Sequence, residues 1–95
     1  FPHISGFAFV ADLSRPVGSR IVDVTINDQA IDPTAIFTLA TNEYIARGGD
    51  NYQSFAAAKT ILEADDASLV VSQVIDYISA AGEVSPVVEG RMTFK

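Results

Sequence analysis

The stretch Gly48-Gly49-Asp50-Asn51-Tyr52 is the part of this sequence best suited to chemistry. Glycines let backbone amides approach a ligand closely, an aspartate accepts hydrogen bonds from sugar hydroxyls, and a tyrosine ring offers a flat surface for stacking. The same residue types are also typical of a tight turn whose tyrosine packs into the core, because tyrosine is commonly at least partly buried. From the loop alone, a binding role and a structural role both stay open.

Beyond this loop, the sequence offers few groups for catalysis. Its one histidine is His3 and it has no cysteine, so a Ser-His-Asp triad would depend on a residue near the chain terminus, where backbones fray. The adjacent Asp65 and Asp66 are better explained by the attraction of carboxylates to a helix start than by a metal, since hydrolytic metal sites usually combine several histidines and carboxylates. We expect no catalytic set, metal site or cofactor within this chain.

Charge and length limit the classes of partner. The 95 residues carry 12 acidic and 6 basic side chains, which gives a net charge of −6. This argues against binding to a nucleic-acid backbone, which needs clustered Lys and Arg. No run of 18 apolar residues occurs, so no membrane span is expected. The length suits a single domain over residues 1–95 with one modest core, and the start at Phe1 instead of Met indicates a piece of a longer polypeptide.

The hydrophobic pattern predicts the strands and helices that must position the loop. Short apolar runs and strict alternation predict strands, and the loop itself falls between a helical turn and a short helix. The clearest element is a helix over residues 67–81 with apolar residues at i, i+3 and i+4 spacing, Asp66 or Ser68 as its cap and Gly82 as its end. The expected strands cover residues 7–11, 20–28, 36–41, 60–63 and 91–95, and the expected short helical segments cover residues 42–47 and 53–59.

The order of these elements lacks regular βαβ alternation. It favours an α+β fold in which a mixed β-sheet packs with the one long helix and the short helices. Residues 36–41 have apolar side chains on both faces of the expected strand, so they are expected to form a central strand that is covered on both sides. The apolar stripe of the helix over residues 67–81 is expected to pack on a face of the sheet.

Three stretches in order resemble the C-terminal domain of the 5′-nucleotidase family, which includes UDP-sugar hydrolases and ecto-5′-nucleotidases. Residues 4–9 read ISGFAF and run on to DLSRPVGSRIV at residues 12–22. Residues 41–52 read TNEYIARGGDNY, and residues 87–92 read VVEGRM. The resemblance covers nearly the whole chain, and it implies the greater part of such a domain without its N-terminal portion.

The resemblance implies a division of labour between two domains. Enzymes of this family hold two divalent metal ions and a catalytic His-Asp dyad in an N-terminal metallophosphoesterase domain, while the C-terminal domain grips the nucleoside between two aromatic rings. It implies that Tyr52 is one of these rings and that Asn42, Gly48, Gly49 and Asp50 belong to the same nucleotide site. It also implies a periplasmic, secreted or cell-surface protein.

One departure from the family pattern affects the expected substrate. A carboxylate shortly after the glycine loop typically binds the ribose hydroxyls in this family, and residues 53–59 contain none. The alternatives are therefore a domain of a related cyclic-nucleotide phosphodiesterase or sulfur-oxidation hydrolase, or a binding or structural module without catalysis. If the start of the domain is missing, an apolar face or sheet edge is left open, and self-association of the fragment is expected.

Overall fold

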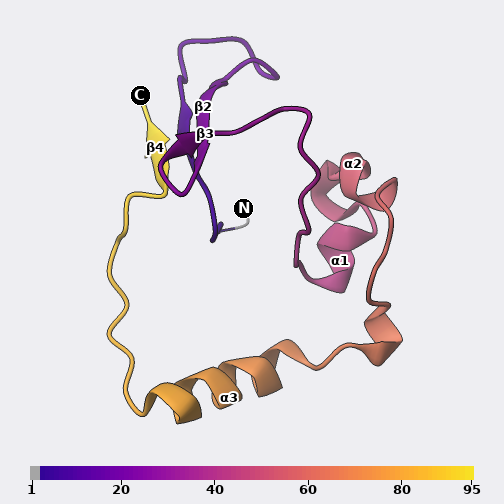
Figure 1. Cartoon of the computed structure of the whole chain (residues 1–95). Coiled ribbons are helices and arrows are strands. Elements are labelled where there is room, and N and C mark those ends of the chain that lie inside the picture. The colour runs from indigo at the N-terminus through magenta and orange to yellow at the C-terminus, as the bar shows by residue number, and fades with distance from the viewer. Residues whose placement is uncertain (1–2) are drawn as a thin grey trace. The chain divides into compact units, whose positions relative to one another are not determined.

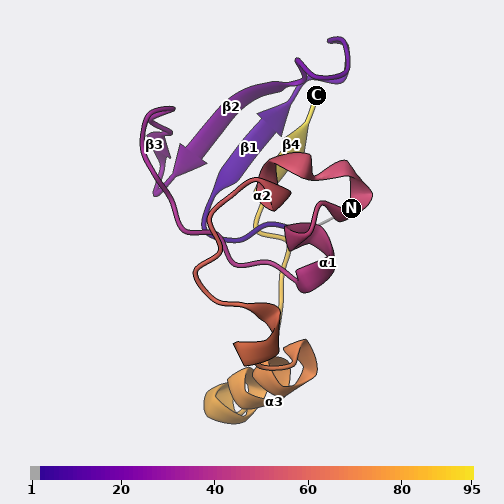
Figure 2. The same ribbon diagram turned by 90° about the vertical axis from the view of Figure 1, so that its right-hand side faces the viewer.

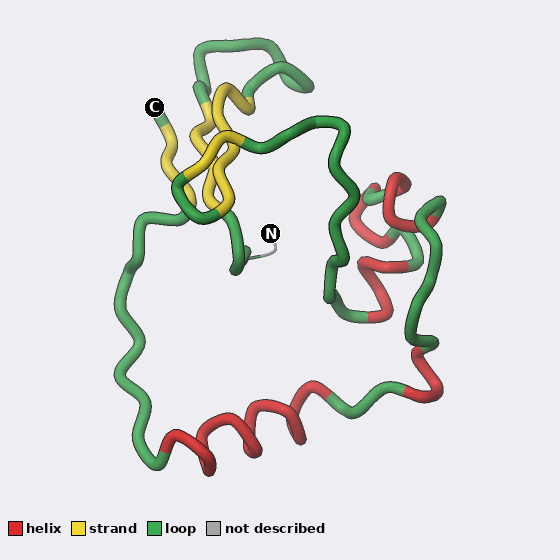
Figure 3. Tube along the Cα trace, viewed as in Figure 1, coloured by secondary structure: helices red, strands yellow, loops and turns green. Residues whose placement is uncertain are grey.

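The computed structural model describes residues 3–95 and divides the chain into two compact units. One unit comprises the chain up to Phe37 together with Pro86–Lys95, and the other comprises Thr38–Ser85. All the strands lie in the first unit and all the helices lie in the second, as the trace coloured by secondary structure makes clear (Figure 3).

The first unit is a four-stranded mixed sheet (Figures 1 and 2). Its strands are β1 Ala8–Ala11, β2 Ile21–Ile26, β3 Gln29–Ala30 and β4 Met92–Phe94, in the order β3-β2-β1-β4. β1 pairs antiparallel with β2 and parallel with β4, so the first and last segments of the chain become neighbours. The expected mixed sheet is therefore confirmed.

Local sequence accounts for the hairpin at one edge of this sheet. In β2 the half-buried Val22 and Val24 flank the exposed Asp23, which matches the predicted alternation. Asn27 and Asp28 then have φ of 51° and 60°. Two-residue turns with positive φ match the twist of paired strands, and Asn and Asp tolerate this conformation better than most residues.

Packing in the first unit centres on β1. Ala11 is 4% exposed, and the rings of Phe9 and Phe94 meet edge to face with their centroids 6.0 Å apart and their planes at 89°. This arrangement places the positive edge of one ring on the negative face of the other. The parallel pairing of β1 with β4 brings these two rings together.

The second unit contains short helices and one longer helix. Its core residue is Ile45, which is 5% exposed and lies in α1. The helices are α1 Glu43–Ala46, α2 Gln53–Ala56 and α3 Val70–Ala81, and two 3₁₀ turns cover Gly49–Asn51 and Ala64–Asp66. The expected short helical segments are confirmed, although α2 ends three residues earlier than predicted.

Two of the expected strands are wrong. Residues 36–41 form no strand, and Ile36 is 98% exposed while Phe37 and Leu39 are each 54% exposed. Residues 60–63 form a bend instead of a strand. An apolar run becomes a central strand only when other strands pair with it and layers cover both of its faces, and nothing in residues 3–95 does this for either segment.

The long helix differs from expectation at its start. It begins at Val70, after an extended Leu69 that makes no side-chain capping bond, so neither Asp66 nor Ser68 caps it. Its end is as predicted, because Gly82 has φ 76° and its amide donates to the Ile78 carbonyl at 2.9 Å. No residue of α3 is buried. The packing of its apolar stripe on the sheet stays a prediction, because the helix and the sheet belong to different units.

Candidate functional site

The site is built on α1, which is held at its start by Asn42. Asn42 is extended, and its Oδ1 accepts a hydrogen bond from the Ile45 amide at 2.9 Å. This N-cap satisfies one of the amides that a helix start leaves without an intrahelical partner. An exposed ion pair of 2.6 Å between Arg47 and Glu43 joins successive turns of the same helix. Asn42 therefore stabilises α1, the helix from which the glycine loop follows, through its capping bond.

Two glycines carry the chain out of α1. Gly48 is buried with φ 93°, a conformation that suits glycine because a Cβ is strained there. A Cβ on Gly48 would also lie 3.1 Å from Gln53 Nε2, whose amide donates to the Gly48 carbonyl at 3.3 Å. The backbone conformation therefore favours glycine at position 48, and a larger residue would also displace the end of the Gln53 side chain slightly.

Gly49 is required by a close approach of Tyr44. A Cβ on Gly49 would lie 2.6 Å from Cε1 and Cζ of the Tyr44 ring and 2.6 Å from the Tyr44 carbonyl oxygen. The Tyr44 hydroxyl then reaches past Gly49 and donates to Oδ1 of Asp50 at 3.0 Å. Asp50 and the following Asn51 both have positive φ, at 52° and 67°. The loop is thus a tight turn in which Gly48, Asp50 and Asn51 have left-handed backbone conformations. The ring of Tyr44 lies against it.

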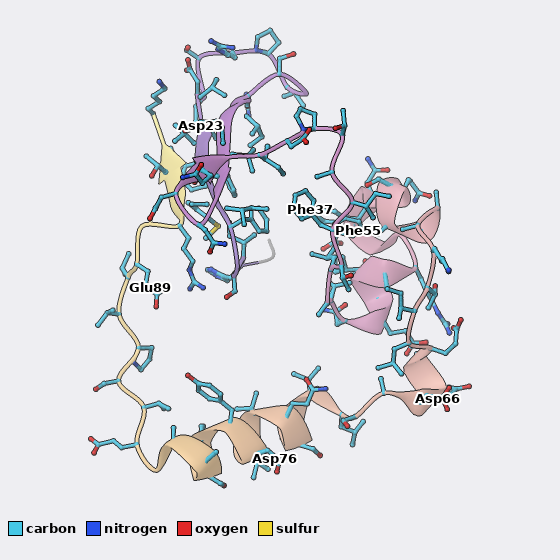
Figure 4. The ribbon with its side chains drawn as sticks, viewed as in Figure 1. Asp23, Phe37, Phe55, Asp66, Asp76 and Glu89 are labelled. Carbon is cyan, nitrogen blue, oxygen red and sulfur yellow. The ribbon has the colours of Figure 1, made fainter. Side chains whose placement is uncertain are left out.

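Tyr52 lies at the end of this turn and at the start of α2. Its amide donates to the Gly49 carbonyl at 3.1 Å, and its ring stacks on Phe55 with centroids 5.4 Å apart and planes at 13°. The side chain is half-buried, so the ring is neither enclosed in a core nor fully in solvent. Phe55, labelled on α2 in Figure 4, was not among the predicted site residues. Its spacing of three residues from Tyr52 across a helix start is the signal that would have found it.

A surface hollow of about 540 Å³ opens beside the turn. It is lined by Glu43, Tyr44, Arg47 and Gly49, so Gly49 is the predicted site residue that reaches it. The structure places the five predicted residues along residues 42–52, where Asn42 caps α1, Gly48, Gly49 and Asp50 form the turn, and Tyr52 precedes α2. It adds Tyr44 and Phe55 to them.

The described residues offer neither a metal cluster nor a membrane-spanning helix. Within residues 3–95, no group of three or more histidine or acidic side chains gathers in a way that could hold a metal ion. In the same part of the chain, every helix is too short or too polar to cross a bilayer.

Comparison with known proteins gives the family. Residues 1–57 match the family described as 5′-nucleotidase, C-terminal domain. The chain is 33% identical over 102 residues to a 5′-nucleotidase of Diplobatis ommata and 33% identical over 99 residues to a snake venom 5′-nucleotidase of Crotalus adamanteus, covering 99% and 96% of this chain. It spans 17% and 16% of the length of these two relatives.

A solved structure shares the fold. The crystal structure of a 5′-nucleotidase precursor from Thermus thermophilus matches with a TM-score of 0.84 and 28% sequence identity. The match covers 95% of this chain and 18% of that one. The family match extends over more than half of the residues and includes the glycine turn and Tyr52. The chain belongs to the 5′-nucleotidase C-terminal domain family.

Proposed function

We propose that this chain is the nucleotide-recognition part of a metal-dependent 5′-nucleotidase, and that Tyr52 stacks on the base of the substrate. The observation that carries the proposal is the half-buried Tyr52 ring, stacked on Phe55 at 5.4 Å at the end of the glycine turn. Membership of the family and the match to 5′-nucleotidases along the chain support it.

Physical chemistry supports stacking as the source of affinity. A base stacked on an aromatic side chain contributes about 1 to 3 kcal/mol and tolerates different bases, because every base has a π face. Phe55 restricts the Tyr52 ring before the ligand arrives, so less side-chain freedom is lost on binding. A broad nucleotide specificity follows from this mode of recognition.

The polar residues of the turn have separate roles in the proposal. Gly48 and Gly49 let the backbone approach the ligand, and Asp50 accepts hydrogen bonds from hydroxyl groups of the sugar. Asp50 uses Oδ1 for Tyr44, and a carboxylate has lone pairs for further donors. Asn42 holds α1, and with it the start of the turn, in place.

Phosphate release is assigned to another part of the protein. We propose that the partner of this chain is a metallophosphoesterase domain of the same polypeptide, which carries two divalent metal ions and the hydrolytic groups. The relatives are about six times longer than this chain, which leaves room for such a domain in them. A venom enzyme among the relatives supports a secreted or cell-surface location.

The test is a substitution of Tyr52 in the polypeptide that joins this chain to its catalytic domain. Tyr52→Ala is expected to raise KM for AMP by about fivefold or more with little change in kcat, because stacking holds the ground state and the transition state alike. Steady-state kinetics measures both constants. Tyr77→Ala, on the exposed α3, is the matched control.

Two outcomes bear on the proposal. An unchanged KM in Tyr52→Ala would remove Tyr52 from the site. The 95-residue chain alone is expected to release no phosphate from AMP with added Mn²⁺, Zn²⁺ or Mg²⁺, and metal-dependent release by pure chain would contradict the assignment of catalysis to another domain.

A further inference from the structure

We infer that Tyr44 is a positioning residue, which locks the glycine turn and thereby sets the place of the Tyr52 ring. This inference rests on the proposed function, because it concerns how the same site is prepared for its nucleotide. The sequence motif drew attention to the glycines and to Tyr52, whereas Tyr44 enters only through the contacts of its ring and its hydroxyl.

The ring of Tyr44 leaves no room for the turn to move toward it. A methyl group on Gly49 would lie 2.6 Å from two ring carbons, a distance that real Cβ atoms do not tolerate. The same group would lie 2.6 Å from the Tyr44 carbonyl oxygen, so the backbone of Tyr44 also lines this contact. A residue larger than glycine at position 49 would therefore clash with both the ring and the backbone of Tyr44.

The hydroxyl of Tyr44 fixes the next residue. Tyr44 Oη donates to Asp50 Oδ1 at 3.0 Å, across six positions of sequence. Asp50 and Asn51 both occupy left-handed backbone conformations, which are unfavourable for residues with a Cβ and persist when surrounding contacts over-determine them. Within residues 3–95, the Tyr44 hydroxyl is the one side-chain donor that holds Asp50 in this conformation.

The turn transmits this restraint to Tyr52. The Gly49 carbonyl accepts the Tyr52 amide at 3.1 Å, and the Tyr52 carbonyl accepts the Phe55 amide at 3.1 Å. A shift of Gly49 or Asp50 therefore moves the Tyr52 backbone and disturbs the stack of Tyr52 on Phe55. The chain of contacts runs from the Tyr44 hydroxyl through Asp50 and Gly49 to the ring proposed to hold the base.

A role in general stability is a weaker explanation for Tyr44. Its side chain is 61% exposed, so it contributes little to the buried core of this unit, whose buried apolar residue is Ile45. Removing only its hydroxyl leaves the ring over Gly49 and changes one solvent-exposed hydrogen bond. Tyr44→Phe is therefore a mild variant that separates positioning from folding.

The experiment compares Tyr44→Phe, Tyr52→Ala and the double variant in the polypeptide that joins this chain to its catalytic domain. Tyr44→Phe is expected to raise KM for AMP about twofold to tenfold at unchanged kcat and unchanged melting temperature, the range expected for the loss of one solvent-exposed hydrogen bond. It is expected to add nothing in the Tyr52→Ala background, because the ring it positions is then gone. Tyr77→Phe, which removes a hydroxyl from the exposed α3, is the matched control.

The outcomes separate this inference from the proposed function. If Tyr52→Ala raises KM and Tyr44→Phe does not, the inference fails and the proposed function stands. An equal effect of Tyr44→Phe with and without Tyr52 also overturns the inference, because Tyr44 then acts independently. If Tyr52→Ala leaves KM unchanged, both fail.

A spectroscopic measurement on the 95-residue chain covers the case of a variant that disturbs folding of the larger protein. Nuclear Overhauser contacts between the Tyr52 and Phe55 rings report their stack directly. They are expected to weaken in Tyr44→Phe and to be unchanged in Tyr77→Phe. Unchanged ring contacts in Tyr44→Phe would overturn the inference.

Discussion

Tyr52 and Phe55 illustrate how a pair of side chains can prepare a binding surface at the residue scale. The two rings are nearly parallel, at 13°, and lie on successive turns of backbone at the start of α2. A ring that already has one neighbour loses less freedom when a base stacks on it. The backbone of the preceding turn is also unusual, because Asp50 and Asn51 both have positive φ. Strained conformations of this kind cluster at functional sites.

The residue scale also gives a pH dependence, at the turn that follows β1. The pKa of Asp12 is lowered, first by the Ser14 hydroxyl that donates to Oδ1 at 2.6 Å and then by the Ser14 amide at 3.0 Å. Arg15, with its Nε 3.5 Å from Oδ2, lowers this pKa further. Thr34 lowers the pKa of Asp32 in the same manner through a similar pair of bonds.

The sign of this pH effect follows from the lowered pKa of the folded state. The stabilisation of the turn is fully present above the unfolded pKa of Asp12, and it is lost as the pH falls through the lower folded value. We expect the Ser14 amide resonance to move and its hydrogen exchange to speed up below about pH 4. Asp12→Asn keeps an oxygen acceptor that does not titrate, so its Ser14 amide is expected to show no such transition. A Ser14 amide that titrates above the ordinary aspartate range in the parent chain would contradict the prediction.

At the scale of elements, the short α1 is better defined than its length suggests. A helix of 4 residues is far below the length at which isolated helices persist in water, so its formation depends on its cap and on the buried Ile45. α3 has 12 residues but no side-chain cap and no buried residue. Although α1 is the shorter helix, it has both a side-chain cap and a buried residue, and α3 has neither.

A cap substitution tests this view of α1. Asn42→Ala removes the acceptor of the Ile45 amide and is expected to weaken α1 by about 1 kcal/mol, which corresponds to roughly fivefold faster exchange of that amide. Asn42→Asp keeps an oxygen acceptor and is expected to retain the protection. Native-state hydrogen exchange of Ile45 gives the comparison, and equal protection in Asn42→Ala would show that the cap is dispensable.

At the scale of the whole molecule, the chain leaves much apolar surface uncovered. The apolar stripe of α3 is exposed throughout, with Val74 at 49%, Ile75 at 58% and Ile78 at 42%. Asp76 projects from α3 in Figure 4, and helical spacing places it on the side away from the apolar stripe. A stripe of this kind is typical of a surface that another element or another molecule covers.

This exposure leads to a prediction of self-association for the 95-residue chain. Its sedimentation coefficient is expected to rise with concentration, because pairing of two α3 stripes removes apolar surface from water. Ile78→Glu, within the stripe, is expected to suppress the rise, whereas Ser72→Glu on the polar side is expected to leave it unchanged. A single monomeric species over the whole concentration range would contradict the prediction.

Features that depend on local pattern could be predicted from the amino-acid sequence. Alternation in β2, the turn formers Asn27 and Asp28, the glycines of the site turn and the end of α3 at Gly82 were all readable, because backbone conformation and amphipathic spacing are set by neighbours along the chain. The three motifs likewise placed the chain in its family.

Which segments acquire partners became clear only from the fold. Residues 36–41 had the composition of a central strand, yet strand formation needs a paired neighbour, and none of the four strands of the sheet pairs with them. Within the site, the contact of Tyr44 with Asp50 likewise appears only after the turn has folded, whereas the spacing of Phe55 from Tyr52 was readable along the chain. Contacts through space depend on where the whole chain goes, and a pattern of neighbours along the chain does not contain that information.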